Sequence, residues 1–260
     1  MVSQVSAVTL IPPPHLSASS ISTFQQCPLR YKYSRIDELP EPPSEASLMG
    51  NFVHDILEGL YRQESSTRTL GTARMLAASL WNDYEERAMK VAKTPEAIRR
   101  FRWNSWWCVE KLFSMEDPTQ REFDGLEHEI NHEINGVRVK GFIDRWHLHN
   151  DGIVIGDYKT GKTPKPHYAG DKFFQLLLYG VVLHEQLGKP IESVELLYIK
   201  DGERLHKSPT AEDMQSVYDT VVEIRTGIDE RCATGEFEYK PSRLCDWCSF
   251  KSICPYWRKK

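Results

Sequence analysis

The chain of 260 residues has a formal net charge of −4, and 40% of its residues are hydrophobic while 27% are charged. This composition can bury a full core and argues against extensive disorder. No segment approaches about eighteen consecutive apolar residues, and the first fifteen residues lack a signal-peptide pattern. We therefore expect a soluble, cytoplasmic protein without membrane contact. The acidic balance is unusual for a nucleic-acid enzyme, although carboxylates that hold cations lower the formal charge without opposing such binding.

The first half of the chain is predicted to be mostly helical, over residues 16–116. A flexible, proline-rich leader over residues 1–15 precedes a helix over 16–35, whose expected cap is one of three serines: Ser17, Ser19 or Ser20. Apolar residues at helical spacing then predict three more helices, over residues 48–61, 72–92 and 95–115.

The second half changes character. Between Arg121 and Lys159 apolar and polar residues alternate, with breaks at Asn135-Gly136 and Asn150-Asp151-Gly152, which predicts three antiparallel strands. Helical and strand patterns follow, with helices over 167–188 and 210–233 and a strand over 194–199. We expect a single α/β domain over residues 16–260: a small mixed sheet flanked by helices, a catalytic core over 121–200 and a cysteine-rich tail over 235–260.

An acid and a base share one strand of the predicted core. Side chains alternate along a strand, so Asp157 and Lys159 project from one face, and Asp144 on the preceding strand can meet Asp157 across the ladder. Such a cluster offers oxygen ligands to Mg²⁺ or Mn²⁺, and Lys159 could orient or deprotonate a water molecule or neutralise a transition state. The alternative is a surface ion pair of Asp144 with Lys159 and a turn cap at Asp157. The apolar run before Asp157 argues against it, because burying unpaired charges is costly.

Two helices carry further polar candidates. His54 lies one turn from Gly50 and from Glu58, on a face where the glycine would let another backbone approach closely. A lone histidine on a helix is more often a core or surface residue, but its neutral imidazole could complete a carboxylate metal site. Gln175 and Tyr179 are also four residues apart; they could hold a phosphate or Lys159, and Tyr179 could equally be packing.

Four of the six cysteines form a pattern. Cys245, Cys248 and Cys254 lie within ten residues, and three thiolates do not complete a four-coordinate site. Cys27 is the natural fourth ligand, since it precedes a proline as Cys254 does. An iron–sulfur cluster, a zinc ion and reduced thiols are all compatible with this spacing. The other two cysteines are expected to be buried in helices: Cys108 and Cys232.

Taken together and in this order, the motifs resemble the RecB-like branch of the PD-(D/E)xK nucleases, with their restriction-endonuclease-like core. The iron–sulfur members are the most similar, namely the CRISPR-associated exonucleases and the AddB-type nuclease domains. The resemblance covers residues 16–257 and rests on six segments: Leu16–Pro28, Gly50-x₃-His54, Gly141–Arg145, Asp157–Gly161, Gln175-x₃-Tyr179 and the Cys-x₂-Cys-x₅-Cys tail.

The resemblance implies a role for each matching residue. Mg²⁺ or Mn²⁺ would be held by His54, Asp144, Asp157 and the backbone carbonyl of Tyr158. Lys159 would be the catalytic lysine, and Gln175 with Tyr179 would form the accessory motif. A [4Fe–4S] cluster would be held by Cys27, Cys245, Cys248 and Cys254. Asp157 stands where many relatives have glutamate, and either acid fits the motif. Glu127 and Glu129, on the preceding strand, could extend the site, and the sequence does not choose between them.

The resulting expectation is a Mg²⁺- or Mn²⁺-dependent DNA exonuclease. It would prefer single-stranded DNA or DNA with a free end, and act in DNA repair, recombination, phage replication or CRISPR spacer processing. The chain has no phosphate-cradling glycine-rich loop, so a helicase, recombination or CRISPR-adaptation partner would be a separate protein. A non-catalytic DNA-binding or scaffold subunit and an electron carrier are the alternatives. Three tryptophans near arginines could form a stacking surface, although burial in the core is the favoured interpretation: Trp103, Trp106 and Trp107.

Overall fold

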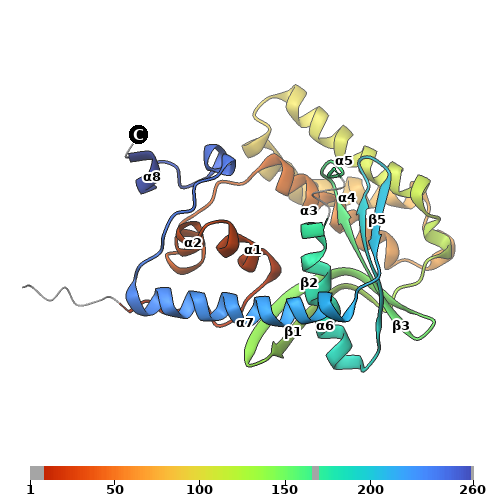
Figure 1. The fold of residues 1–260 in the computed structure, drawn as a ribbon. Coiled ribbons are helices and arrows are strands. Elements are labelled where there is room, and N and C mark those ends of the chain that lie inside the picture. Colours follow the sequence, from red (N-terminus) through yellow and green to blue (C-terminus); the bar gives the residue numbers. More distant parts are fainter. Residues whose placement is uncertain (1–8, 166–169, 259–260) are drawn as a thin grey trace, which may run out of the picture. The chain divides into compact units, whose positions relative to one another are not determined.

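The computed structural model describes residues 9–165 and 170–258 of the chain (Figure 1). The chain divides into two compact units. Unit 1 comprises Met1–Pro42, Ile130–Gly141 and Ala211–Lys260, and unit 2 comprises Pro43–Glu129 and Phe142–Thr210. No helix in the described ranges is both long enough and apolar enough to cross a lipid bilayer.

Unit 2 carries most of a five-stranded sheet and four helices. The helices are α3 (Glu45–Tyr61), α4 (Leu70–Val91), α5 (Pro95–Met115) and α6 (Phe174–Leu187). The strands, in sheet order, are β1 (Gly125–Ile134), β2 (Val137–His149), β3 (Gly152–Lys159), β4 (Ile191–Tyr198) and β5 (Glu203–Lys207). Neighbouring strands are antiparallel at β2–β3 and β4–β5 and parallel at β3–β4, where α6 makes the connection that parallel strands require. Single 3₁₀ turns occur at Ser65–Thr67, Pro118–Gln120 and Gly170–Phe173.

Two tight turns fix the register of the first three strands. Asn135 and Gly136 have φ of 47° and 80°, and Asn150 and Asp151 have φ of 46° and 67°. Two successive positive φ values are what a two-residue hairpin of the type I′ class requires, and asparagine and glycine adopt them at low cost. Both predicted hairpins are therefore confirmed.

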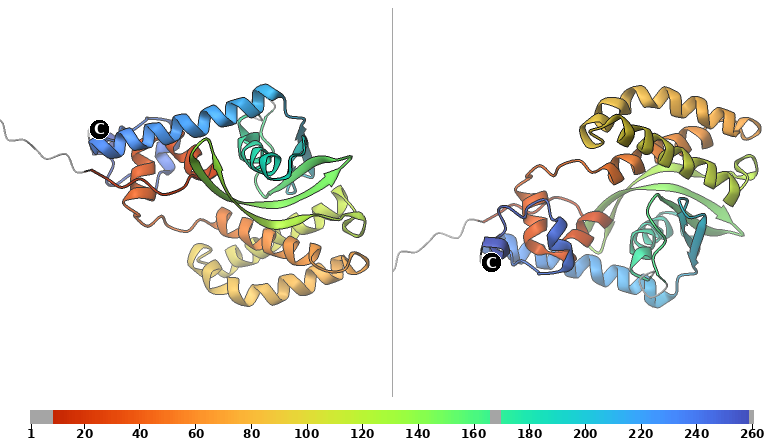
Figure 2. Two further views of the ribbon diagram at one scale, coloured as in Figure 1. Left: turned by 90° about the horizontal axis from the view of Figure 1, so that it is seen from below. Right: turned by 90° about the horizontal axis from the view of Figure 1, so that it is seen from above.

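Helices cover both faces of the sheet in unit 2 (Figure 2). On one side, α3, α4 and α5 pack together around an aromatic group in which Phe52 contacts Trp81, Tyr84 and Phe101. Side chains of β3 and β4 join this core. The other side is covered by α6, where Gly180 lets the side chain of Ile191 approach so closely that an added Cβ would lie 2.8 Å from it. The mixed sheet flanked by helices that the sequence predicts is confirmed.

Unit 1 contains α1 (Ala18–Gln26), α2 (Pro28–Tyr31), a π-helical segment (Lys32–Ile36), α7 (Ala211–Thr234), a 3₁₀ segment (Arg243–Trp247) and α8 (Pro255–Arg258). The prediction of one helix over 16–35 is wrong, because Cys27 is extended, with φ −165° and ψ 107°. Proline disfavours helical geometry in the residue before it, so Pro28 ends α1 and begins α2. The expected cap is confirmed at Ser17, whose side chain accepts a hydrogen bond from the Ser20 backbone.

The described part of the predicted leader is hydrogen-bonded to α7. The backbone N–H of Leu10 donates to the carbonyl of Cys232 at 2.8 Å, and Nη1 of Arg225 donates to the carbonyl of Pro13 at 2.7 Å. Leu16 then exchanges backbone hydrogen bonds with Arg138 and Lys140 of β2. The rest of the leader, residues 1–8, lies outside the described residues, as do residues 166–169 ahead of α6.

Candidate metal centre

A buried ion pair lies at the end of β3. Asp157 is 3% exposed, and its Oδ2 lies 2.6 Å from Nζ of Lys159. Within the described residues Oδ2 has this ammonium as its ionic partner and accepts no other hydrogen bond. Both side chains project from one face of the strand, as predicted. The alternative pairing of Lys159 with Asp144 is wrong, and this buried oxygen is suited to a cation.

The surroundings of this pair favour the protonated form of Lys159 and disfavour the ionised form of Asp157. Burial raises the pKa of Asp157 to about 7, and Asp144 acts in the same direction while Lys159 opposes it. Burial by itself would lower the pKa of Lys159, but Asp157 and Asp144 raise it above its ordinary value. The lysine therefore keeps its proton at neutral pH, which suits neutralising or orienting an anion better than removing a proton from water.

Across the ladder from Asp157 lies the second predicted carboxylate. Arg145 pairs with Gly156 in the antiparallel register of β2 and β3, and Asp144 and Asp157 are the next residue on each strand. Oδ2 of Asp144 accepts a hydrogen bond of 2.8 Å from the backbone N–H of Tyr158. This bond fixes the carboxylate against β3.

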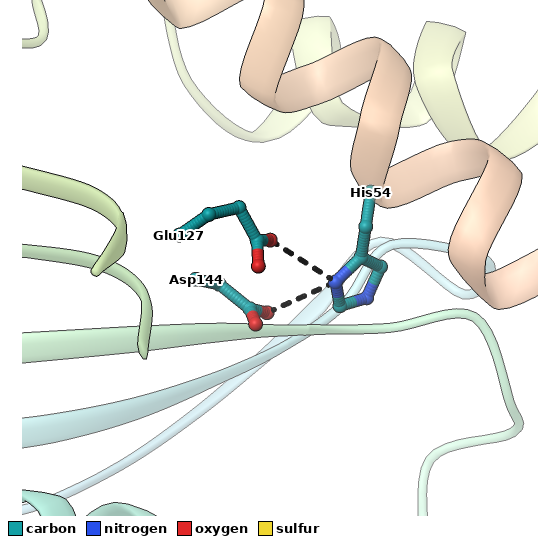
Figure 3. A group of neighbouring side chains, drawn as sticks. All are labelled: His54, Glu127 and Asp144. Carbon is teal, nitrogen blue, oxygen red and sulfur yellow. Dashed lines mark ion pairs between the residues drawn. The ribbon is translucent and has the colours of Figure 1, made fainter. Parts of the chain in front are cut away.

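Three side chains from three elements converge on one point, as Figure 3 shows. Nδ1 of His54, on α3, lies 3.4 Å from Oδ2 of Asp144 and 3.9 Å from Oε1 of Glu127. One ligand atom from each lies within 4.8 Å of the other two, and no other such group of three occurs among the described histidines, cysteines and acids. His54 thus belongs to an acidic cluster and not to the apolar core.

The tautomer of His54 indicates what this cluster can hold. Its Nε2 lies 2.9 Å from the backbone carbonyl of Tyr158, which can only accept, so Nε2 carries a hydrogen. Nδ1 then faces two carboxylates, and a proton or a metal ion must lie between them for the contact to be favourable. Without a metal, Asp144 and Glu127 outweigh the effect of burial and raise the pKa of His54 well above its usual value. An imidazole nitrogen beside hard oxygen ligands fits a divalent ion such as Mn²⁺.

Glu127 reaches the cluster through an unusual backbone. It lies within β1 with φ of 42°, a left-handed value that glutamate rarely adopts. Glu129 lies two residues further along β1, where strand alternation would put it on the same face, but its side chain is exposed. The structure therefore selects Glu127 of the two glutamates that the sequence left open, and the strand alternation by itself contains no signal for this choice.

The prediction that Gly50, His54 and Glu58 act together on one face of α3 is partly wrong. A Cβ at Gly50 would meet the side chain of Thr160 at 3.5 Å, an ordinary contact, so no backbone approach depends on this glycine. Glu58 pairs with Arg62 at 2.6 Å and takes no part in the cluster.

Tyr179 of α6 is buried, with 5% of its surface exposed. Burial raises its pKa to about 12, and the carboxylates of Asp157 and Asp144 add to this rise, while Gln175 and the backbone of Phe142 act against it. Of the two predicted α6 residues, Tyr179 is thus influenced by the charges of the cluster, and Gln175 is its hydrogen-bond partner. Tyr179 keeps its hydroxyl proton at neutral pH and can donate a hydrogen bond.

A buried ion network supports the strand ends, and the sequence did not indicate it. Arg145, next to Asp144, donates from both terminal nitrogens to the carboxylate of Glu116, and Nη1 also donates to the hydroxyl of Tyr158 at 3.0 Å. A Cβ at Gly156 would lie 2.6 Å from Nε of Arg145, so the glycine makes room for this guanidinium. The network thus links the neighbours of Asp144 and Asp157.

The four predicted cluster cysteines line one cavity in unit 1: Cys27, Cys245, Cys248 and Cys254. All four are half-buried free thiols. Within the described residues, no three cysteine sulfurs lie inside 4.8 Å of one another. Thiolates on one tetrahedral zinc ion would be about 3.8 Å apart, since each lies about 2.3 Å from the metal. The remaining two cysteines are buried as predicted: Cys108 and Cys232.

The prediction that the three tryptophans of α5 are buried in the core is wrong for two of them. Trp103 is 66% exposed and Trp107 is 40% exposed. Trp106 is half-buried and packs at the edge of the unit 2 core. The helical spacing of these residues did not distinguish an inward from an outward face.

Comparisons with known proteins agree with this geometry. A sequence model of the PD-(D/E)XK nuclease superfamily matches residues 15–255, and so includes both units. The Gene 69 proteins of Mycobacterium phages D29 and L5 are each 23% identical to the chain, over 96% and 94% of it and over 100% and 97% of their own lengths. A crystal structure from Eubacterium rectale, provisionally named an exonuclease, has a TM-score of 0.59 at 16% identity, over 90% of this chain and 87% of that one. At that identity the likeness shows the fold alone, and it is the predicted fold class.

Proposed function

Because this chain belongs to the PD-(D/E)XK nuclease superfamily, we propose that it is a divalent-metal-dependent deoxyribonuclease. The active site would be the cluster formed by side chains of α3, β1, the middle of β2 and the end of β3. One observation carries the proposal: Nδ1 of His54 faces two carboxylates, so that a proton or a metal ion must lie between them, beside a buried aspartate–lysine pair. This combination has no use in a protein that only binds DNA, which argues against a scaffold subunit.

The residues fit Mg²⁺ or Mn²⁺. His54, Asp144 and Asp157 would be ligands, and we add Glu127 to this set because its carboxylate shares the group with His54 and Asp144. The carbonyl of Tyr158 hydrogen-bonds to His54 and stays a proposed ligand. When bound, such an ion supplies positive charge to the phosphate and lowers the pKa of a water molecule.

Lys159 and the α6 residues would act on the phosphate. The raised pKa of Lys159 favours an ammonium that orients phosphate oxygens and offsets the negative charge that develops on them. Tyr179, with its hydroxyl protonated, can donate to the same oxygens, and Gln175 would orient that hydroxyl. Lys159 and Tyr179 would keep their protons through the step. As water adds to phosphorus and the P–O bond to the leaving nucleotide breaks, the proton lost by the water would pass to solvent or to a carboxylate, and the leaving oxygen would take up a proton from solvent.

For the cysteine site in unit 1 we propose a [4Fe–4S] cluster held by Cys27, Cys245, Cys248 and Cys254. The proposal is supported by four half-buried thiols around one cavity, no three of whose sulfurs lie within 4.8 Å of one another in the described residues. The thiolates of such a cluster bind different iron atoms and therefore lie farther apart. Its role would be structural, since it joins residues 27 and 254 and closes most of the chain into one loop.

We further propose that the protein is an exonuclease that prefers single-stranded DNA or DNA with a free end. Two relatives that match over nearly their whole length are mycobacteriophage proteins, which favours phage replication or recombination over CRISPR spacer processing. A helicase or recombination protein would be a separate partner.

The test is cleavage of end-labelled single- and double-stranded DNA by purified protein with Mn²⁺. Asp157→Ala and Lys159→Ala should each lower the rate by about 10²-fold or more, as loss of a residue that stabilises charge does. Glu129→Ala is the matched control, because this glutamate is exposed on β1 and outside the cluster, and it should cleave as the parent does. Parent-like rates in both site variants, with unchanged circular dichroism, would refute the assignment.

A further inference from the structure

A second feature of unit 2 lies between α4 and α5. Side chains of these two helices, with Phe52 and Ile56 of α3 as the floor, enclose a groove of about 520 Å³. This is within the range of sites that hold organic ligands. Its walls carry three tryptophans and three arginines: Trp81, Trp103, Trp106, Arg74, Arg99 and Arg102.

The groove carries an excess of positive charge, although the whole chain has a negative net charge. The chain has a net charge of −4, whereas the groove is lined by three arginines and by one carboxylate, that of Glu110. Arg99 pairs with Glu96 at the surface. Arg74 and Arg102 have no carboxylate partner within the described part of the chain. A groove with an excess of positive charge on an acidic protein is suited to an anionic ligand.

Arginine and tryptophan alternate around the groove. The guanidinium of Arg102 lies 4.8 Å from the ring centroid of Trp81, and that of Arg74 lies 5.0 Å from the ring of Trp106. Each guanidinium thus lies within cation–π distance of an aromatic ring, and its N–H groups keep their hydrogen-bonding capacity. Trp103 leaves 66% of its surface in water, which is a large apolar exposure without a partner in the described structure.

Resting on the proposed nuclease function, we propose that this groove binds a single-stranded segment of the DNA substrate. A base would stack on the exposed ring of Trp103, and the neighbouring phosphates would pair with Arg74 and Arg102. Aromatic faces interleaved with cations are the combination that single-stranded nucleic acid uses. A duplex keeps its bases stacked inside and offers no face to a tryptophan.

The groove and the metal cluster use different faces of α3. Phe52 and Ile56 are four residues apart and share the face toward the groove, and His54 lies between them, rotated by roughly 200°. The groove is therefore a holding site that does not touch the reacting atoms. Variants in it should raise KM and leave kcat at saturating DNA unchanged, because they remove binding that ground and transition states share.

The experiment measures binding of a fluorescent oligothymidylate to full-length protein in EDTA, which excludes cleavage. Trp103→Ala should weaken binding roughly tenfold, as loss of one stacking partner does. Arg102→Ala should also make the slope of log affinity against log salt shallower by about 0.7, the value for one phosphate contact on a single strand. The slope would not move if Arg102 only supported the fold.

Matched controls lie on the same helices. Trp107 of α5 is exposed but does not line the groove, and Arg87 of α4 lies 4.8 Å from the ring of Tyr84, as Arg102 does from Trp81. Trp107→Ala and Arg87→Ala should bind as the parent does. Equal binding by the parent, Trp103→Ala and Arg102→Ala would overturn the proposal, as would duplex DNA or RNA that binds as tightly through the same residues.

The outcome is separable from that of the proposed function. Binding that depends on the groove, in a protein that cleaves no DNA with Mn²⁺, would support the groove and refute the nuclease. Cleavage that depends on Asp157, with KM unchanged in Trp103→Ala, would support the nuclease and refute the groove.

Discussion

Replacing Glu116 with glutamine tests whether the buried ion network holds the strand ends of the site. The side chain of Glu116 is fully buried, and that of Arg145 is 4% exposed. Besides Arg145, the carboxylate accepts hydrogen bonds of 3.1 Å from Arg204 and of 2.5 Å from the hydroxyl of Tyr61. Glu116→Gln keeps the shape of the side chain but leaves the guanidinium of Arg145 with only the more distant carboxylate of Glu195, at 4.0 Å, as a counter-charge.

Removing one partner of a buried pair costs about 3–5 kcal/mol, because the remaining charge is left in a medium of low polarity. A typical domain is stable by only ~5–15 kcal/mol, so Glu116→Gln should lose a large part of the free energy of unfolding. Urea unfolding followed by circular dichroism measures this loss. Affinity for Mn²⁺ should fall as well, since Arg145 adjoins Asp144 and donates to Tyr158.

The pH dependence gives a second readout of the same pair. Burial by itself would raise the pKa of Glu116, but Arg145 holds it below its ordinary value. Its contribution is therefore complete above the unfolded pKa of about 4.3 and is lost as the pH falls through the lower folded value. Acidification through this range should destabilise the parent more steeply than Glu116→Gln.

The matched control is Glu122→Gln. Glu122 also pairs with a buried arginine, Arg68, but it is 74% exposed, and Arg68 keeps backbone carbonyl acceptors at Gln63, Pro118 and Arg121. Loss of such an exposed partner should cost under ~1 kcal/mol. If both variants lose the same small amount, the network does not carry the stability assigned to it.

Two further predictions concern the metal sites. Glu127→Ala should weaken Mn²⁺ binding, measured by calorimetry, by about 10–100-fold, whereas Glu129→Ala should match the parent; equal affinity in both would remove Glu127 from the ligand set. Cys27→Ser should lower iron and sulfide in anaerobically purified protein and reduce its thermal stability, while Cys108→Ser, which lies in unit 2, should keep the parent's content. Full iron and sulfide in Cys27→Ser, or zinc in place of iron in the parent, would refute the proposed cluster.

Local signals in the sequence were sufficient for the first three strands and for half of the site, whereas β5 was not predicted. Asn135-Gly136 and Asn150-Asp151 prefer positive φ, so each turn could be assigned without knowing the fold. Alternation along β3 then placed Asp157 and Lys159 on one face, and the turn length brought Asp144 opposite Asp157. These inferences depend only on neighbours within one hairpin.

The features that the sequence did not provide depend on tertiary packing. Glu127 joins His54 because β1 takes a left-handed step in mid-strand, and no residue type there marks it. Glu116 and Arg145 are 29 residues apart, and their pairing is visible only once Gly156 is known to make room for the guanidinium. The outward direction of Trp103 follows from which face of α5 packs on α3 and α4, which spacing leaves undetermined.

The packing of α3 gives a physical reason why the metal cluster and the groove can work together. This helix is held by α4 and α5 through Phe52, which contacts the rings of Trp81, Tyr84 and Phe101. The same residue forms the floor of the groove, and His54 extends from the opposite face to Asp144. A strand held in the groove would therefore be anchored to the same rigid helix as a metal ligand. Its position relative to the cluster is then fixed by packing, and binding need not move either site.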